Sequence, residues 1–486
     1  MCETTLGRES GITSLDSRAR WLAFLTVILG DLMIILDVTI VGVALPSIRD
    51  DLGFSEASLA WVVNAYLLTF GGFLLLGGRL GDIFGYRKLF VIGIALFTLA
   101  SLSCGLANSQ ELLTAARAVQ GLAAAVVSAV ALSLTMVLFA KPAERAKAMG
   151  IFGFVAAGGG SIGVLLGGVL TDILNWHWIF LVNVPIGIAV FLLSFKLLPA
   201  EHTAPKSRSL DIAGAVVVTT ALLMAVYAIV NGNSSGWTSA QTLGLLGGSV
   251  ALILAFLVIE NRAKAPLVPL RFFKLRNIQT ANVIGILWAG AMFAWFFLSA
   301  LYLQLVLGYD PLQVGLAFLP GNVVMGVFSA VLSAKLVMKL GIKIPLAVGL
   351  LLAAAGLALF ARAPVDGNYF IDVLPSMILL GIGAGTAFNP LLLVAMSDVK
   401  PHESGLASGI VNTAFMMGGA LGLAVLASLA ASKTTAALAA GSDKLVALNE
   451  GYQAAFLVGA IFAASAAAIG YFVLKPSEAT EAYEAH

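Results

Sequence analysis

Long apolar stretches alternate with short polar interruptions along the whole sequence. Each stretch is continuously apolar over about the 20 residues that a helix needs to span the hydrocarbon core of a bilayer. A transmembrane barrel would instead show alternating positions over about ten residues. The pattern therefore predicts an all-α membrane protein with fourteen spanning helices, at residues 21–45, 58–77, 88–106, 111–138, 146–170, 178–198, 210–231, 241–259, 278–305, 312–335, 344–361, 371–396, 403–430 and 452–473.

Composition agrees with this pattern. The chain has 486 residues, of which 60% are hydrophobic and 11% charged, far from an ordinary soluble domain. Its two cysteines, Cys2 and Cys104, fall on the predicted inner tail and within a span, so they imply no disulfide framework. The first apolar stretch is too long for a signal-peptide core, and we expect it to remain as the first helix.

The basic residues test the number of spans independently. With a cytoplasmic N-terminus, 22 of the 27 Lys and Arg residues fall on inner segments and one, Arg117, lies within the membrane. This bias is the positive-inside rule, and it predicts an even number of spans with both termini in the cytoplasm. The net charge of +2 reflects these inner loops and gives no indication of nucleic-acid binding. The four outer basic residues are Arg49, Arg362, Lys433 and Lys444.

The chain also repeats itself at a shift of about 256–260 residues. "RLGDIFGYRK" from Arg79 matches "KLVMKLGIKI" from Lys335, and "KPAERAKAMG" from Lys141 matches "KPHESGLASG" from Lys400. A third match, "GGGSIG" with "MGGALG", follows in the same order. Two related six-helix halves are the architecture of the major facilitator superfamily, with the substrate path between them. We expect an inner tail at 1–20, bundles at 21–198 and 278–473, a linker at 199–277 with two inserted helices, and a second inner tail at 474–486.

Three ionisable residues lie well inside predicted spans: Asp31, Asp37 and Arg117. Each costs at least about 2.5–3.5 kcal/mol on insertion scales, so such residues usually face a cavity or a partner. Asp37 precedes Leu45 by eight residues and Arg117 follows Glu111 by six, which gives depths of about 12 and 9 Å from the outer surface. Asp37 and Arg117 are therefore candidates to meet. Asp31 lies about 9 Å from Asp37 along the axis and about 120° around the helix.

Three segments carry a more specific resemblance. They are "LDVTIVGVALP" from Leu36, with Gly42 where Asn is more usual, "GGRLGDIFGYRK" from Gly77, and "NWHWIFLVNVPIG" from Asn175, with His177 replacing the usual Arg. Over essentially its whole length the chain resembles the fourteen-span drug:proton antiporters of the superfamily, the EmrB/QacA-like branch. The resemblance implies multidrug efflux by alternating access across the cytoplasmic membrane of a prokaryote, driven by the proton gradient without a cofactor.

The resemblance also implies that an acid in helix 1 and an arginine in helix 4, here Asp37 and Arg117, take part in proton coupling. Burial favours the neutral form of Asp37 and Arg117 favours its charged form, so small changes in hydration would switch its charge. The alternative is a static ion pair between two helices. Asp31, which the signature does not require, is a candidate to select cationic substrates; it could equally be a second proton site or an acid bonded to a neighbouring hydroxyl.

The loop between the second and third spans contains a candidate cytoplasmic gate. Asp82 ends one helix close to Arg87 and Lys88, and Gly85 allows the tight turn between them. These charges could form a latch that breaks when the halves rock, as the resemblance implies. The alternative is a topology signal with a helix cap.

The fifth span contains glycines at a spacing that resembles a motif diagnostic of antiporters. Val164 stands where that motif has proline, so the kink that a proline would impose is not required. Small residues that pack helices together are the alternative explanation. The glycines are Gly150, Gly159, Gly163, Gly167 and Gly168.

Polar and aromatic residues in other spans could line an amphipathic substrate cavity or could simply pack. The candidates are Asn64, Tyr66, Trp295 and Asn389. The sequence contains no phosphate-binding loop, no cluster at metal spacing and no catalytic signature, so neither ATP-driven transport nor an enzyme is indicated. We expect a monomer among membrane lipids that exchanges protons for hydrophobic, cationic compounds. The alternatives are a dedicated exporter of one endogenous metabolite or antibiotic, and an uncoupled facilitator.

Overall fold

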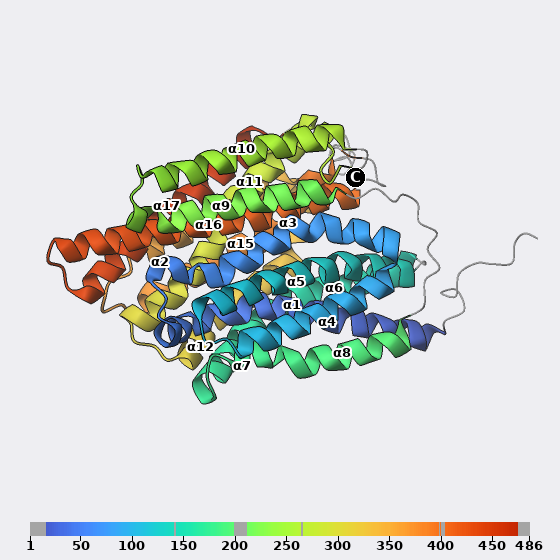
Figure 1. Ribbon diagram of the computed structural model, residues 1–486, viewed down its shortest axis with the longest axis horizontal. Coiled ribbons are helices and arrows are strands. Elements are labelled where there is room, and N and C mark those ends of the chain that lie inside the picture. Colours follow the sequence, from blue (N-terminus) through green and yellow to red (C-terminus); the bar gives the residue numbers. More distant parts are fainter. Residues whose placement is uncertain are drawn as a thin grey trace, which may run out of the picture.

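The computed structural model describes residues 16–139, 142–198, 211–263, 266–397, 399 and 404–474, and this part of the chain is helical without strands (Figure 1). The long helices of the first half are α1 (Ser17–Leu52), α3 (Trp61–Phe84), α4 (Tyr86–Gly105), α5 (Gln110–Leu138), α6 (Pro142–Ile173) and α8 (Asn183–Leu197). Two further helices follow, α9 (Ile212–Ser235) and α10 (Ala240–Arg262). The second half contains α11 (Arg276–Leu301), α12 (Pro311–Val327), α13 (Ser333–Leu340), α14 (Lys343–Phe360), α15 (Leu374–Ser397), α16 (Ser404–Ala439) and α17 (Lys444–Phe472).

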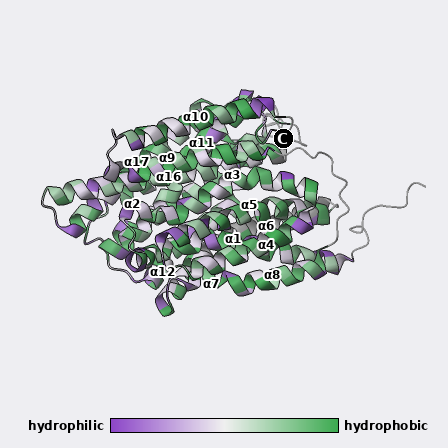
Figure 2. Ribbon diagram, viewed as in Figure 1, coloured by the Kyte–Doolittle hydropathy of each residue, from purple (hydrophilic) through white to green (hydrophobic). Residues whose placement is uncertain are grey.

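The predicted spans coincide with these helices. Within the described residues, 13 helical segments are long and apolar enough to cross a membrane. The remaining predicted span coincides with α6, a helix of 32 residues whose stretch Ile162–Ile173 is apolar. Figure 2 shows hydrophobic residues along the helices and hydrophilic residues gathered towards their ends. The prediction of an all-α, fourteen-helix membrane protein is therefore confirmed.

Helix ends depart from the prediction in several places. α1 continues to Leu52, α16 continues to Ala439 and α17 begins at Lys444, and in Figure 1 the last two project together beyond the other helices. Hydropathy marks the part of a helix that suits lipid, whereas backbone hydrogen bonds can extend the helix further.

Some predicted spans are interrupted. A short helix α2 (Glu56–Leu59) precedes α3, and α7 (Trp178–Leu181) precedes α8. A π-helical segment, η3 (Phe328–Leu332), separates α12 from α13, and two others are η2 (Tyr302–Val306) and η4 (Tyr369–Val373). Such segments widen a helix locally and are not visible in a hydropathy pattern.

The helices pack in two groups that meet along two junctions. α1, α3, α4, α5, α6 and α8 contact one another, as do α11, α12, α14, α15, α16 and α17. Between the groups, α6 packs against α12 and α3 packs against α16. The additional helix α9 contacts both α3 and α16, while α10 packs on α9. The inserted pair therefore covers one junction.

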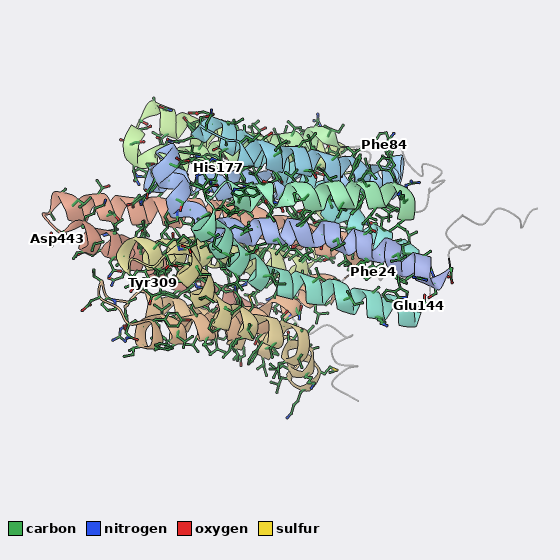
Figure 3. All side chains as sticks on the ribbon, turned by 90° about the horizontal axis from the view of Figure 1, so that it is seen from below. Phe24, Phe84, Glu144, His177, Tyr309 and Asp443 are labelled. Atoms are coloured by element: carbon green, nitrogen blue, oxygen red, sulfur yellow. The ribbon has the colours of Figure 1, made fainter. Side chains whose placement is uncertain are left out.

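The two ends of the helices separate the residues that the sequence assigns to opposite sides. Figure 3 shows His177, Tyr309 and Asp443 towards one end and Phe84 and Glu144 towards the other. The two groups of helices contact each other closely near the end that contains His177, Tyr309 and Asp443. There Gln304 Nε2 donates to the Val43 carbonyl at 2.8 Å, and a methyl group on Gly168 would collide with the Pro311 carbonyl.

Candidate functional site

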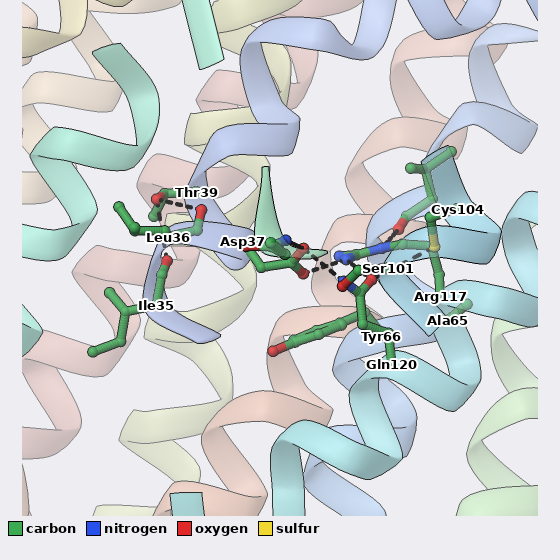
Figure 4. Close-up of polar contacts among 12 residues, drawn as sticks. Ile35, Leu36, Asp37, Thr39, Ala65, Tyr66, Ser101, Cys104, Arg117 and Gln120 are labelled. Carbon is green, nitrogen blue, oxygen red and sulfur yellow. Dashed lines mark hydrogen bonds and ion pairs between the residues drawn. The ribbon is translucent and has the colours of Figure 1, made fainter. Parts of the chain in front are cut away.

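Asp37 and Arg117 form a fully buried ion pair between α1 and α5. Arg117 Nη1 lies 2.5 Å from Asp37 Oδ2, and the side chains of Arg117 and Asp37 are 1% and 0% exposed (Figure 4). The agreement of their depths predicted this meeting. A charge pair so far from water requires further hydrogen bonds to be tolerated.

The second oxygen of Asp37 supplies part of that compensation. Asp37 Oδ1 accepts hydrogen bonds from Gln120 Nε2 at 2.7 Å and from Asn183 Nδ2 at 3.0 Å. Gln120 Nε2 also donates to Ser101 Oγ at 2.8 Å, and Gln120 Oε1 accepts from Arg117 Nη1 at 2.7 Å. The carboxylate therefore receives donors from α5 and α8, which favours its ionised form while the arginine stays in place.

Arg117 is held from several sides. Its Nε donates to the Val62 carbonyl at 2.9 Å. Its guanidinium carbon lies 4.3 Å from the centre of the Tyr66 ring and 5.7 Å from that of Phe180. Because arginine does not give up its proton at physiological pH, this position carries a fixed positive charge.

Local sequence explains how α5 presents this face. Ser109 caps the helix by accepting from the Leu112 N–H at 3.2 Å. Arg117 and Gln120 are three residues apart and so lie on the same side of the helix. Gly121 allows α5 to approach α3 closely, because a methyl group there would collide with the Tyr66 carbonyl.

Asp31 forms a separate contact. Its Oδ1 accepts from Ser128 Oγ at 3.1 Å, and the residue is 4% exposed. Although about 120° separates Asp31 from Asp37 around the helix, both carboxylates reach α5, since α1 and α5 pack along each other. The neighbouring hydroxyl that the sequence left open as one alternative is thus present, on Ser128.

Among the other cavity candidates, Asn64 and Tyr66 lie near this pair on α3. Asn64 is 0% exposed and Tyr66 is 1% exposed. Neither Asn64 amide atom has a hydrogen-bond partner in the described part of the structure, and the Tyr66 hydroxyl has none there either. These are polar groups that a substrate, a water or a proton could engage.

Trp295 and Asn389 lie elsewhere, on α11 and α15. The Trp295 ring is 1% exposed and contacts Phe296 and Phe318 at centroid distances of 4.3 and 6.5 Å. Asn389 Nδ2 donates to the Ser329 carbonyl, at the π-helical segment η3, at 2.8 Å. Both residues thus have packing contacts in the second group of helices, and neither contributes to the hydrogen bonds around Asp37.

The candidate gate is partly described. Gly85 joins α3 to α4 with φ 90° and ψ 135°, a conformation that requires glycine, as the tight turn predicted. Arg87 Nη2 donates to the Phe195 carbonyl at 2.7 Å, near the end of α8, while Lys88 is exposed. The Asp82 side chain lies outside the described residues, so the proposed latch remains a prediction.

The glycines of α6 form a packing surface. Methyl groups on Gly159, Gly163 and Gly167 would press on α1, at Ile35, Thr39 and the Ile40 carbonyl respectively. Gly168 faces α12 instead, and the surroundings of Gly150 lie outside the described residues. α6 runs without interruption through the buried Val164, where the motif has proline.

Sequence reasoning missed Gln120, Asn183 and Ser101. Gln120 could have been found from its position three residues after Arg117, and Asn183 from the quoted segment "NWHWIFLVNVPIG". Ser101 carried no signal. In the described residues no group of three or more His, Cys, Asp or Glu side chains could hold a metal ion.

Comparisons with known proteins agree with this geometry. The sequence profile of the Major Facilitator Superfamily matches residues 27–423. The chain is 38% identical to the puromycin resistance protein pur8 of Streptomyces alboniger, over 91% of this chain and 88% of that one. It is 40% identical to the cephamycin export protein CmcT of Amycolatopsis lactamdurans, over 88% of each chain.

Solved structures share the fold at lower identity. A bacterial homologue of the human lysosomal transporter Spinster, in an inward-facing and occupied conformation, aligns with a TM-score of 0.70 at 15% identity, over 94% of this chain and 97% of that one. The xylose transporter XylE from E. coli aligns with a TM-score of 0.63 at 16% identity, over 96% and 99%. The chain belongs to the Major Facilitator Superfamily, in the branch that includes these resistance and export proteins.

Proposed function

We propose that this protein exports hydrophobic, cationic drugs or toxic compounds in exchange for protons. The observation that carries the proposal is the buried Asp37–Arg117 pair, with its two further donors, Gln120 and Asn183. A buried carboxylate that depends on one arginine changes its partners when it takes up a proton. Such a change is what a proton-driven conformational cycle requires.

Protonation of Asp37 removes the negative charge that holds Arg117. The neutral carboxyl retains hydrogen bonds to Gln120 and Asn183, while the guanidinium keeps the Val62 carbonyl and the Tyr66 ring. The attraction between α1 and α5 is then weaker. We expect this difference to favour one of two arrangements of the helices, and a transporter needs only a differential preference of this kind.

The arrangement of the halves supports alternating access. We assign the two rocking bodies to residues 21–198 and 278–473, with 199–277 as the linker that contains α9 and α10. The bodies touch at Gln304 and Val43 and between α6 and α12. We assign this end to the outer surface of the cytoplasmic membrane, with both termini in the cytoplasm, because the basic residues favour that orientation.

We assign the selection of cationic substrates to Asp31. A carboxylate in the cytoplasmic half of the path would attract a cation there, and Ser128 is its one polar contact in the described residues. Asn64 supplies a further polar group, and Asp82, Gly85, Arg87 and Lys88 form the cytoplasmic gate. The protein works as a monomer surrounded by lipid.

The decisive experiment compares Asp37→Asn with the parent protein in vesicles. The two sets of vesicles contain equal amounts of protein, and a pH gradient drives efflux of a lipophilic cation from them. We expect Asp37→Asn to lose gradient-driven transport while it still equilibrates the cation across the membrane. Full proton-coupled transport by this variant would contradict the proposal.

A second candidate function has a specific basis in the relatives. CmcT is described as a cephamycin export protein, and a relative from Streptomyces glaucescens is described as a tetracenomycin C resistance and export protein, so each name refers to a single antibiotic. A dedicated exporter of one antibiotic would protect cells from a single compound in a susceptibility screen, whereas a multidrug exporter would protect against several.

A further inference from the structure

The hydroxyl of Tyr66 lies in the interior without a hydrogen-bond partner among the described residues. The residue is 1% exposed. Buried tyrosine hydroxyls usually find a partner, so a position that leaves one free calls for a functional explanation.

The ring that carries this hydroxyl is firmly placed. It lies under the Arg117 guanidinium and stacks on Phe70 at a centroid distance of 5.9 Å. In Figure 4 its hydroxyl end lies on the Asp37 side of the group. The charged residues around this hydroxyl are Asp37, Arg117 and Asp31.

The two acids cannot exchange a proton directly. Asp31 and Asp37 are six residues apart on α1, or about 9 Å along its axis. Proton transfer needs groups within hydrogen-bond reach or joined by one water. A hydroxyl can accept one proton and donate another. A phenol placed between the two carboxylates could therefore pass a proton from one to the other.

We infer that Tyr66 relays a proton from Asp37 to Asp31, which deepens the proposed function and rests on it. The Asp37 carboxyl gives its proton to the Tyr66 oxygen as the phenolic proton passes to the Asp31 carboxylate, with a bridging water where a gap exceeds hydrogen-bond length. Tyr66 is neutral before and after the step. Asp37 ends as a carboxylate paired with Arg117, and Asp31 ends as a neutral carboxyl.

The groups around the path are suited to this transfer. Arg117 on α5 is the fixed charge. The neutral side chains that donate to the acids are Gln120 and Ser128 on α5 and Asn183 on α8. Ser101 and Cys104 on α4 contact Gln120 in turn and are also neutral. A proton that reaches Asp31 removes the negative charge that attracts a cation. Proton and cationic substrate therefore compete for Asp31.

The test uses Tyr66→Phe, which removes the hydroxyl and keeps the ring under the Arg117 guanidinium. Tyr452→Phe is the matched control, because Tyr452 is also 1% exposed with an unpartnered hydroxyl among the described residues but lies on α17. Each full-length variant is reconstituted in vesicles with tetraphenylphosphonium as the probe. Gradient-driven transport, cation exchange at equal pH and binding at fixed pH are measured.

We expect Tyr66→Phe to slow gradient-driven transport by about 100-fold while exchange and binding stay within about twofold of the parent. At a tetraphenylphosphonium concentration that saturates both variants, adding Asp31→Asn should slow gradient-driven transport no further, because both changes interrupt one path. Parental gradient-driven transport by Tyr66→Phe would overturn the relay, and so would an equal loss of binding, which would identify Tyr66 as a substrate contact. If the parent itself shows no proton-driven transport, the proposed function fails, and that outcome is distinct from the other two.

Discussion

Gln120 Nε2 lies 2.7 Å from Asp37 Oδ1, and the same amide group reaches Ser101. Gln120 thereby ties the carboxylate to both α5 and α4. Its amide oxygen also accepts from Arg117, so one neutral side chain connects both members of the ion pair.

Replacing Gln120 by Leu should therefore destabilise the protein. The change leaves buried polar atoms of Asp37, Arg117 and Ser101 with one partner fewer, which costs about 1–3 kcal/mol. Thermal unfolding of the purified protein in detergent would measure the loss. Gln453→Leu is the control, because Gln453 donates to the Ala363 carbonyl far from the pair. Equal stability of Gln120→Leu and the parent would contradict the prediction.

Replacing Arg117 by Leu should have a larger effect. The substitution leaves the 0% exposed carboxyl group of Asp37 without its counter-charge, and breaking a buried pair in this way costs about 3–5 kcal/mol. The double variant Asp37→Asn, Arg117→Leu should regain part of this stability because it also removes the unpaired charge. Thermal unfolding of both variants checks the prediction, and a double variant less stable than Arg117→Leu alone would count against it.

Gly163→Ala should weaken the contact between α6 and α1. The added methyl group would collide with Thr39 and approach the Leu36 carbonyl, and overpacking of this kind costs about 1–3 kcal/mol. Gly42→Ala is the matched control on α1, because a methyl group there meets no atom within 4 Å. Thermal stability and transport rate should fall for the first variant only. Equal behaviour of the two would show that α6 tolerates the added volume.

Asp31→Asn should alter the choice of substrate by charge. We expect binding of a lipophilic cation at fixed pH to weaken at least about tenfold, which corresponds to about 1.4 kcal/mol, while a neutral hydrophobic compound binds as before. The amide keeps the size of the side chain and can still accept from Ser128. Binding titrations with both compounds provide the measurement. If cation and neutral compound changed equally, Asp31 would have no role in charge selection.

The sequence by itself determined which segments span the membrane and that Asp37 and Arg117 share a depth. Spanning is a local property, because lipid requires about 20 apolar residues with all backbone hydrogen bonds satisfied within the helix. Depth follows from the constant rise per residue. Neither inference needs to know which helices are neighbours.

Only the tertiary structure decided which helices and side chains contact one another. The hydrogen bonds to Asp37 come from residues 80, 83 and 146 positions away along the chain. Tertiary structure also set α9 against both α3 and α16. Apolar helices in lipid have no hydrophobic drive to choose one partner over another, so close packing of small residues and buried polar contacts select the neighbours. These depend on surfaces that form only when helices distant in the sequence come together.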